Sequence, residues 1–389
     1  MKKVERTLLF LVLLFLPTQL GRHFWPQFSF VYSLPIDYLS PTIYFWDILV
    51  LLLFFIFLWK KSHINQTALS LVFVFILTQS LSLLGQANLG AGFVRLEQYF
   101  IASLLGIYLA SINLKEFKSV FFWALSLSLL GESILAILQF IKASTVGLWI
   151  LGERSFSLST PGIAKFDFYG LEFLRPYGTF PHPNVLAGFM VIVVLLLSWW
   201  KLKAKTIYIT TFLAGVTILL TVSRIAIMAG LGSALLSFKK KARLLLILVV
   251  VLLLPILYTR FASVFNFDIL SLIRREQQIS IAFNLWRHHP LLGVGLNNFI
   301  IVASDQLLAG PSRFLQPVHN IFLLSLSETG IVGLIGLISL IGYPLWKGRF
   351  RLLWLVVIFL GMFDHYFLTL PQGYRLFFLI WGISLSMLE

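Results

Sequence analysis

The chain contains twelve apolar runs bounded by polar or charged residues, and most of them are near the length that spans a bilayer as a helix. The first run and those within 206–258 are short, so we expect one or two of them to be tilted, partial or re-entrant. Inside a membrane every backbone polar group must be satisfied by the protein, and an α-helix does this within its own segment. The runs therefore predict an all-α, polytopic membrane helix bundle of about 12 transmembrane helices, forming a single integral membrane domain over residues 1–389. The predicted spans are 7–20, 42–59, 67–85, 93–112, 119–141, 185–200, 206–222, 224–238, 244–258, 319–343, 352–368 and 374–388.

The composition supports a membrane protein. Hydrophobic residues make up 59% of the chain and the mean hydropathy is +0.93, whereas soluble domains are roughly 45–50% apolar. No small-x-small cleavage site follows Leu16 and Pro17, so we interpret the first run as a retained helix rather than a signal peptide. Cysteine is absent, which excludes disulfides and thiolate metal sites. The net charge of +15 would indicate nucleic acid on a soluble protein; here we attribute it to membrane topology and expect no nucleic-acid partner.

The basic residues divide between the two sides of the predicted bundle. With the N-terminus in the cytoplasm and every span crossing, 17 of the 30 Lys and Arg residues fall in short cytoplasmic segments, as the positive-inside rule requires. These are 13 Lys and 4 Arg, whereas the 13 on the outer side are 11 Arg and 2 Lys. Because arginine presents a planar fork that grips phosphate or carboxylate, this bias predicts an anionic ligand outside. Alternatively, these arginines pair with Asp167, Glu172 and Asp268, or with lipid headgroups.

Two external segments, 142–184 and 259–318, are longer than simple connections and are typical of functional loops. We expect both to carry short amphipathic helices. In the second, apolar residues from Ile269 to Trp286 are interspersed with Arg274 and Arg275. This pattern predicts a helix that lies on the membrane surface or, alternatively, a lid helix that packs on the bundle.

Two stretches near the outer surface combine helix breakers with basic side chains. In RPYGTFPHPNVLAGFM, residues 175–190, the prolines and Gly178 predict an irregular entry into the following span. Asn184 lies near the N-cap of that span, with Arg175 and His182 beside it; a stiff, capped turn without further function is the alternative. Arg224 lies where two short spans meet, where an arginine either snorkels to the surface or marks a ligand path.

A third stretch places a histidine at a helix end. The segment PVHNIFLLSLSETGIVG, residues 317–333, follows RHHPLLGVGLNNF, residues 287–299. On a continuous helix His319 lies on one stripe with Gly330 and Gly333, glycines that let a neighbouring helix approach closely. His319 is therefore predicted to lie at the outer end of its helix as a candidate general base; the alternative is an ordinary interfacial histidine.

The predicted topology directs the N-termini of four spans, 185–200, 224–238, 319–343 and 374–388, toward the outer surface. A helix N-terminus attracts anions because its backbone N–H groups and dipole are positive. Arg175, Arg224 and Arg375 lie near three of these ends, and His319 lies at the fourth. This arrangement suits a pyrophosphate.

Motifs for metal chemistry are missing from the sequence: it has no Asp-x-Asp, no phosphate-binding Gly-x-x-x-x-Gly-Lys and no His-Glu-x-x-His. We therefore predict a metal-independent site without a cofactor, in which arginine supplies the positive charge. The last polar pair, Asp364 and His365, resembles a polar interfacial turn.

At these residues the chain resembles the O-antigen ligase and polymerase family of bacterial membrane glycosyltransferases. Its ligase branch carries His-Asn, nine residues and Gly-x-x-Gly, which His319, Asn320, Gly330 and Gly333 match in full. The stretches GTFPHPNVLAGF, HHPLLGVGLNNF and DHYFLTLPQGYRLFF are also similar, and the likeness covers roughly residues 90–385.

The resemblance implies transfer of a glycan from undecaprenyl pyrophosphate to an acceptor hydroxyl on the periplasmic face of the bacterial inner membrane, as in lipopolysaccharide biosynthesis. The acceptor is lipid A-core in ligases and another glycan chain or a protein in relatives, so an O-antigen or exopolysaccharide polymerase stays open. From a different class, an anionic-solute transporter also explains the arginines. Transporters, however, usually hold ionisable residues at mid-membrane between repeated halves.

The resemblance also implies a role for each candidate residue. Arg175 and Arg224 grip the pyrophosphate and stabilise its charge, and His319 accepts the proton of the attacking hydroxyl. The predicted substrate-binding residues are Asn320, His182, Asn184, Arg375 and Arg287.

The charge alternation generates a test of topology. Both termini and the segments around Lys203 and Lys240 should be cytoplasmic, because short basic loops are retained there. Fusions at either lysine should activate a cytoplasmic reporter and leave a periplasmic one silent. A periplasmic signal at either position would overturn the twelve-span arrangement.

Overall fold

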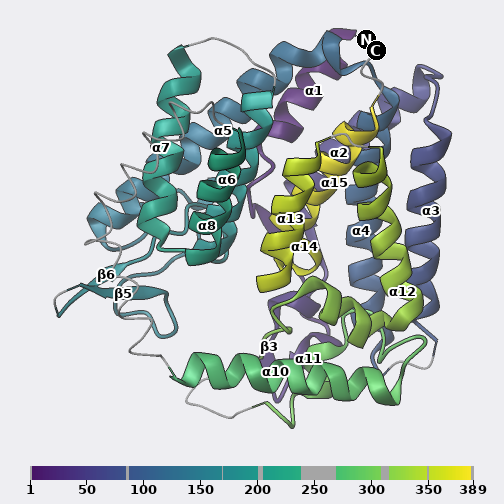
Figure 1. The fold of residues 1–389 in the computed structure, drawn as a ribbon, viewed down its shortest axis with the longest axis vertical. Helices are drawn as coiled ribbons and strands as arrows, with labels where there is room; N and C mark the ends of the chain where they lie inside the picture. The colour runs from purple at the N-terminus through teal and green to yellow at the C-terminus, as the bar shows by residue number, and fades with distance from the viewer. Residues whose placement is uncertain are drawn as a thin grey trace.

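The computed structural model is a bundle of helices with both chain termini at one end (Figure 1). It describes residues 2–84, 87–168, 170–199, 205–237, 269–307, 315–347 and 350–386. The bundle helices are α1 (Lys2–Leu14), α2 (Phe45–Trp59), α3 (Gln66–Leu81), α4 (Leu89–Ser111), α5 (Leu114–Lys142), α6 (Pro183–Trp199), α7 (Lys205–Thr221), α8 (Arg224–Ser237), α12 (Ile321–Trp346), α13 (Arg351–Phe363) and α15 (Pro371–Leu385). Three further helices, α10 (Ile269–His288), α11 (Phe299–Ala303) and α14 (Tyr366–Thr369), lie toward the end opposite to the termini.

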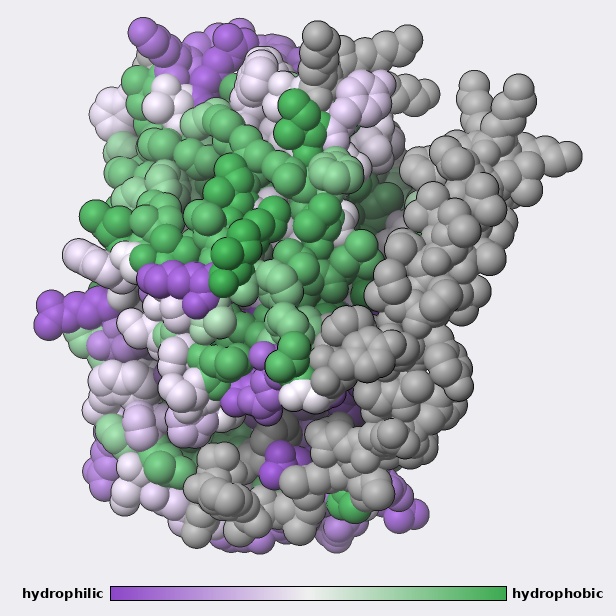
Figure 2. Space-filling view, turned by 90° about the vertical axis from the view of Figure 1, so that its left-hand side faces the viewer, coloured by the Kyte–Doolittle hydropathy of each residue, from purple (hydrophilic) through white to green (hydrophobic). Residues whose placement is uncertain are grey.

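Eleven of the twelve predicted spans overlap one of these bundle helices, although 7–20 and 352–368 extend past the ends of α1 and α13, and the twelfth, 244–258, lies outside the described residues. Among the described helices, α4, α5 and α12 are long and apolar enough to cross a membrane, and α2, α3, α6, α7, α8 and α13 are shorter apolar helices. Figure 2 shows a broad hydrophobic band on one face, with hydrophilic residues above and below it. Exposed apolar side chains in such a band are expected where lipid replaces water. The helices are therefore those of a multi-pass membrane protein.

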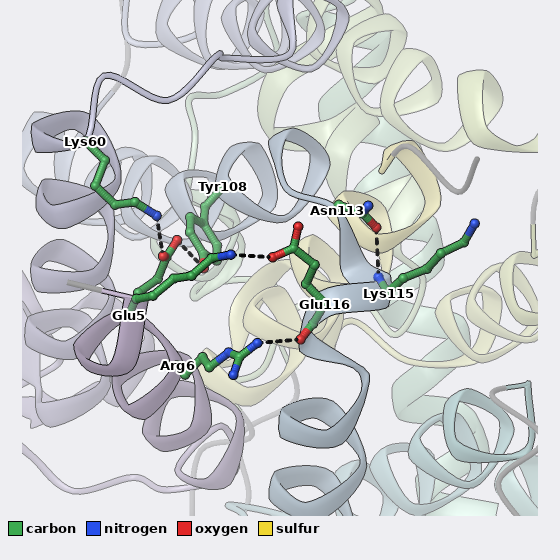
Figure 3. Close-up of polar contacts among 8 residues, drawn as sticks. Glu5, Arg6, Lys60, Tyr108, Asn113, Lys115 and Glu116 are labelled. Carbon is green, nitrogen blue, oxygen red and sulfur yellow. Dashed lines mark hydrogen bonds and ion pairs between the residues drawn. The ribbon is translucent and has the colours of Figure 1, made fainter.

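Polar contacts tie four helices together at the end that carries the termini (Figure 3). The Glu5 carboxylate of α1 is only 2% exposed, and it accepts from Lys60 Nζ at 2.5 Å and from the Tyr108 hydroxyl at 3.2 Å. Beside it, Lys2 pairs with the Glu116 carboxylate at 3.1 Å. A buried carboxylate is tolerated only when it is paired in this way, so these contacts join α1 to α2, α4 and α5.

The prediction of amphipathic helices in 142–184 was wrong. Beyond α5 this segment contains one short 3-10 turn, Trp149–Leu151, and an antiparallel hairpin of β5 (Lys165–Phe168) and β6 (Leu171–Leu174). The sequence KFDF alternates with the period of two that a strand requires. Phe166 and Phe173 are opposite each other in the hairpin, and both stack on Phe140 of α5. The all-α description also misses two short ladders before α2: β1 (Gly21–His23) with β4 (Thr42–Tyr44), and β2 (Phe30–Val31) with β3 (Leu34–Pro35).

The predicted helix in 259–318 is present as α10, which runs across the end of the bundle opposite to the termini (Figure 1). Gln278, Ile281, Ala282 and Leu285 are buried at successive turns of one face, and α10 packs against α12. This is the lid arrangement that the sequence left as an alternative. Contact of α10 with the membrane surface stays a prediction.

The continuous helix predicted through the glycine stripe is broken at Gly330, whose φ of 63° and ψ of −166° are not helical. Residues 290–295 enter the break and pair with it through the main chain. The bonds are Ile331 N to Pro290 O, Val332 N to Leu291 O, Val294 N to Ser327 O and Gly295 N to Glu328 O, at 2.8–3.2 Å. A Cβ on Gly330 would lie 2.2 Å from the Leu291 carbonyl oxygen. Gly330 therefore admits a loop. At Gly333 a Cβ would lie against Thr329 of α12 itself and 3.3 Å from Gln79 Nε2 of α3, which donates to the Gly333 carbonyl at 3.1 Å.

The break in α12 predicts a difference between two of its glycines. Gly330→Ala should lower the unfolding temperature in detergent, since the backbone conformation costs a non-glycine residue about 1–3 kcal/mol and the methyl group collides with backbone. Gly342→Ala is the matched control, because a Cβ there meets no atom within 4 Å. Equal unfolding temperatures for the two variants would contradict the assigned role of Gly330.

Candidate functional site

Three histidines from distant parts of the chain meet at the end of the bundle opposite to the termini. His182 precedes α6, His319 precedes α12, and His365 lies between α13 and α14. The rings of His319 and His365 are 5.0 Å apart and nearly perpendicular. His182 and His319 are both close enough to His365 to lower its pKa through their charge, and His319 acts on His182 in the same way. All three lie in connections outside the spanning helices.

The His-Asn pair is placed by capping of α12. The Asn320 side-chain oxygen accepts from the backbone N–H groups of Phe322 and Leu323 at 2.9 and 3.0 Å. Its amide donates to the Met362 carbonyl at the end of α13 at 3.1 Å. Asparagine is a preferred N-cap because it satisfies the free N–H groups of the first turn. His319, one residue earlier, is therefore held outside the helix beside its positive end.

His319 is also held by α10. Its Nδ1 atom lies 2.9 Å from Oε1 of Gln278, an oxygen that can only accept. In the neutral ring Nδ1 therefore carries the proton and Nε2 keeps its lone pair. A neutral imidazole with a free lone pair on Nε2 can accept a proton.

The segment before His182 is fastened to α5. Glu132 accepts from the Thr179 backbone N–H at 2.9 Å and from its hydroxyl at 2.7 Å. Gln139, two turns further along α5, accepts from the Gly178 N–H at 2.8 Å. A Cβ on Gly178, where φ is +59°, would lie 2.3 Å from the Glu132 carboxylate. Glu132, for which the sequence indicated no role, thus shapes the turn that presents His182.

His182 carries its proton on the other nitrogen. The backbone N–H of Asn184 donates to His182 Nδ1 at 3.2 Å, and the His182 carbonyl accepts from Val185. His182, rather than the neighbouring Asn184, is therefore the N-cap of α6. With Nδ1 accepting, a neutral His182 keeps its proton on Nε2 and can donate a hydrogen bond.

Arginines surround the histidines. Arg175 donates from Nε to the Thr221 carbonyl at 2.6 Å and from Nη2 to Asn184 Oδ1 at 2.7 Å. Arg275, on α10, is close enough to lower the pKa of both His182 and His319. Arg224, exposed at the start of α8, is within electrostatic range of Arg275. These side chains make the surroundings of the histidines strongly positive.

Burial and nearby positive charge keep the imidazole rings neutral. Burial first, and the charge of Arg275 second, lower the pKa of His319 to about 3. Burial, followed by Arg175, lowers the pKa of His182 to about 3. Asp364 responds in the opposite direction, because burial raises its pKa to about 6 although the His365 backbone N–H donates to it. At neutral pH the imidazoles are uncharged and Asp364 is largely ionised.

The surrounding loops are fixed by two buried charged side chains. Arg95 of α4 donates from Nη1 to the Thr369 carbonyl at 2.7 Å and from Nη2 to Asn297 Oδ1 at 3.2 Å. Glu328 of α12 accepts from the Phe299 N–H at 3.1 Å, which caps α11. Glu328, also unexplained by the sequence, therefore holds the segment that follows the 290–295 loop.

Two predicted substrate-binding residues are Arg375, buried in α15, and Arg287, exposed on α10. Arg375 is completely buried, donates to the Thr18 carbonyl at 2.9 Å and lies over the rings of Tyr44 and Trp46, both at 4.7 Å. Arg287 is exposed at the C-terminal end of α10, roughly 18 Å along the helix from Arg275 at 1.5 Å per residue. The other predicted residues, Arg175, His182, Asn184, Arg224, His319 and Asn320, lie at or beside the histidine cluster.

Four residues of the site were not predicted from the sequence. Arg275 and Gln278 belong to α10, and their spacing of three residues places them on one face of a helix. Asp364 and His365 were interpreted as an interfacial turn, although the Asp-His pair between two apolar runs was a visible signal. Among the described residues, no group of three or more His, Asp or Glu side chains is arranged to hold a metal ion.

Comparison with known proteins agrees with the predicted resemblance. No curated protein matches the chain. Residues 209–338 match the family model described as O-antigen ligase, a range that includes Arg224, Arg275, Gln278 and the His-Asn pair. The resemblance predicted from the His-Asn and Gly-x-x-Gly residues is thus confirmed over residues 209–338, which are similar to the O-antigen ligase family.

Proposed function

We propose that this protein is a metal-independent membrane glycosyltransferase that moves a glycan from undecaprenyl pyrophosphate to an acceptor hydroxyl at the outer face of the bacterial inner membrane. The observation that carries the proposal is the neutral His319, with the lone pair of Nε2 available, at the N-terminus of α12 and among arginines. The outward orientation is supported by the position of the site at the end opposite to both termini and by the basic cytoplasmic loops.

The transfer is a single displacement. The acceptor oxygen attacks the anomeric carbon, the bond from that carbon to the pyrophosphate oxygen breaks, and the hydroxyl proton passes to His319 Nε2. Arg175, Arg224 and Arg275 stabilise the negative charge on the departing undecaprenyl pyrophosphate. The Nε2–H of His182 donates to the same group. Substrate and protein atoms alone complete this step.

The acceptor defines the physiological reaction. Lipid A-core as acceptor makes the protein a ligase, and a second glycan chain makes it a polymerase. Purified protein supplied with donor and each acceptor in turn distinguishes them by product length. An anionic-solute transporter would leave the donor bond intact with either acceptor.

His319 should be essential for turnover but not for donor binding. A positioned general base contributes about 10²–10⁴-fold in rate, so His319→Ala should lower the transfer rate by that order while the arginines still bind the donor. Turnover and donor binding are measured separately for His319→Ala and His319→Gln. If His319→Gln turned over near the wild-type rate, the histidine would be a hydrogen-bond donor and the general-base role would be lost.

Arg275 and Arg287 offer a matched pair on one helix. Arg275→Ala should weaken binding of the pyrophosphate donor about 10–100-fold, because a hydrogen bond to a charged group is worth roughly 1.5–3 kcal/mol. Arg287→Ala should bind normally, since that side chain is exposed at the far end of α10. Equal weakening by both would indicate a non-specific effect of surface charge and remove Arg275 from the site.

A further inference from the structure

Gln278 makes two hydrogen bonds that determine the orientation of its amide. The side chain is completely buried on the inner face of α10. Its Nε2 donates to the Gln316 carbonyl at 3.1 Å, and its Oε1 lies 2.9 Å from His319 Nδ1. Because the Gln316 carbonyl can only accept, the NH₂ group must face it. The amide oxygen then faces His319, and because this oxygen can only accept a hydrogen bond, the donor is the Nδ1–H group of His319.

We propose that Gln278 is a positioning residue, which holds the proton of His319 on Nδ1 and thereby keeps the lone pair of Nε2 directed at the acceptor hydroxyl. The inference rests on the proposed transferase function and assigns to α10 a part in it beyond covering the site. A free imidazole exchanges between two tautomers, and only the one with the proton on Nδ1 presents a basic Nε2. Loss of the Gln278 contact should therefore reduce the fraction of protein competent to accept the proton.

A neutral amide orients the ring in a different way from a carboxylate. A carboxylate at Nδ1 would also fix the tautomer, but it would stabilise the imidazolium and raise the pKa of the histidine. An amide oxygen offers the same acceptor without a net charge. His319 in this protein is thus oriented while burial and Arg275 keep its pKa low.

The other charged and titratable groups around His319 come from three further segments. Arg275 lies on α10, His182 lies before α6, and Asp364 and His365 lie between α13 and α14. The imidazoles are neutral at pH 7, so Arg275 and Asp364 are the charged neighbours. A reaction that needs a general base slows as the pH falls through the pKa of that base. Because the pKa of His319 is about 3, kcat/KM of the wild type should stay constant between pH 7 and pH 5.

The experiment compares three variants of the full chain in detergent or in vesicles. Gln278→Leu removes the acceptor and should lower kcat at least about tenfold, a part of the 10²–10⁴-fold contribution of a base. Gln278→Glu restores an acceptor with a charge, and an adjacent opposite charge should move the acid limb of the kcat/KM profile upward by about 1–3 pH units. Gln277→Leu is the control: Gln277, also on α10, donates to the Gln306 carbonyl, and its replacement leaves the contact between Gln278 and His319 in place.

A purely structural Gln278 would give a different result. Gln278→Leu and Gln277→Leu would then lose equal activity, and the pH profile of Gln278→Glu would coincide with that of the wild type. Either outcome overturns the proposal. The change in pH profile is the decisive measurement, because loss of packing alone does not alter the pKa of the base.

A second measurement is independent of transfer activity. Nitrogen NMR of histidine-labelled wild-type protein, with the His319 signals assigned from their loss in His319→Ala, should show the proton on Nδ1 and an unprotonated Nε2. Gln278→Leu should show a mixture of tautomers. A proton on Nε2 in the wild type would reject the inference even with normal transfer. Absence of glycan transfer by the wild type, combined with the expected tautomer, would instead reject the proposed function alone.

Discussion

The main-chain pairing between the loop at residues 290–295 and the break in α12 is the interaction on which the arrangement of the site depends. Four backbone hydrogen bonds join the two segments around Gly330. The loop follows α10 directly, so the pairing anchors the C-terminal end of α10 to the middle of α12. The Gln278–His319 bond joins the same two helices again at the N-terminal end of α12. With two attachments, α10 cannot rotate about its axis without breaking one of them.

The need to satisfy backbone groups explains the buried charged side chains. Irregular segments within a membrane protein expose N–H and C=O groups that neither lipid nor a helix satisfies. Glu132 supplies acceptors for the turn before His182, Glu328 caps α11, and Arg95 binds the Thr369 carbonyl after His365. Each of these buried side chains completes the hydrogen bonding of an irregular segment. Glu132 and Arg95 thereby fix the segments that carry His182 and His365.

The two histidines nearest the arginines have complementary proton positions. A backbone N–H fixes the proton of His182 on Nε2, whereas the Gln278 oxygen fixes that of His319 on Nδ1. One ring is therefore a donor and the other an acceptor at the same pH, although burial lowers the pKa of both. Local hydrogen bonds, rather than different pKa values, separate their chemistry. A group-transfer site needs both abilities, one for the leaving group and one for the nucleophile.

Much of the fold could be predicted because hydropathy and charge act locally along the chain. Span length, basic loops, the helical pattern of α10 and the order His319–Asn320 all follow from neighbouring residues, and the structure has a helix at each of the eleven predicted spans that it describes. The hairpin of Phe166 and Phe173 was missed because its stability comes from stacking on Phe140, a contact between segments distant in sequence.

Hydropathy and charge along the chain were enough to predict a multi-pass helical protein with arginine and histidine gathered at one end. Contacts between distant segments determine the break of α12 at Gly330, the burial of Arg375 beside Tyr44 and Trp46, and the contact of Gln278 with His319. Periodicity reports which face of a helix is apolar. It carries no information about which distant backbone carbonyl or side-chain amide meets that face, and these contacts determine where each proton lies.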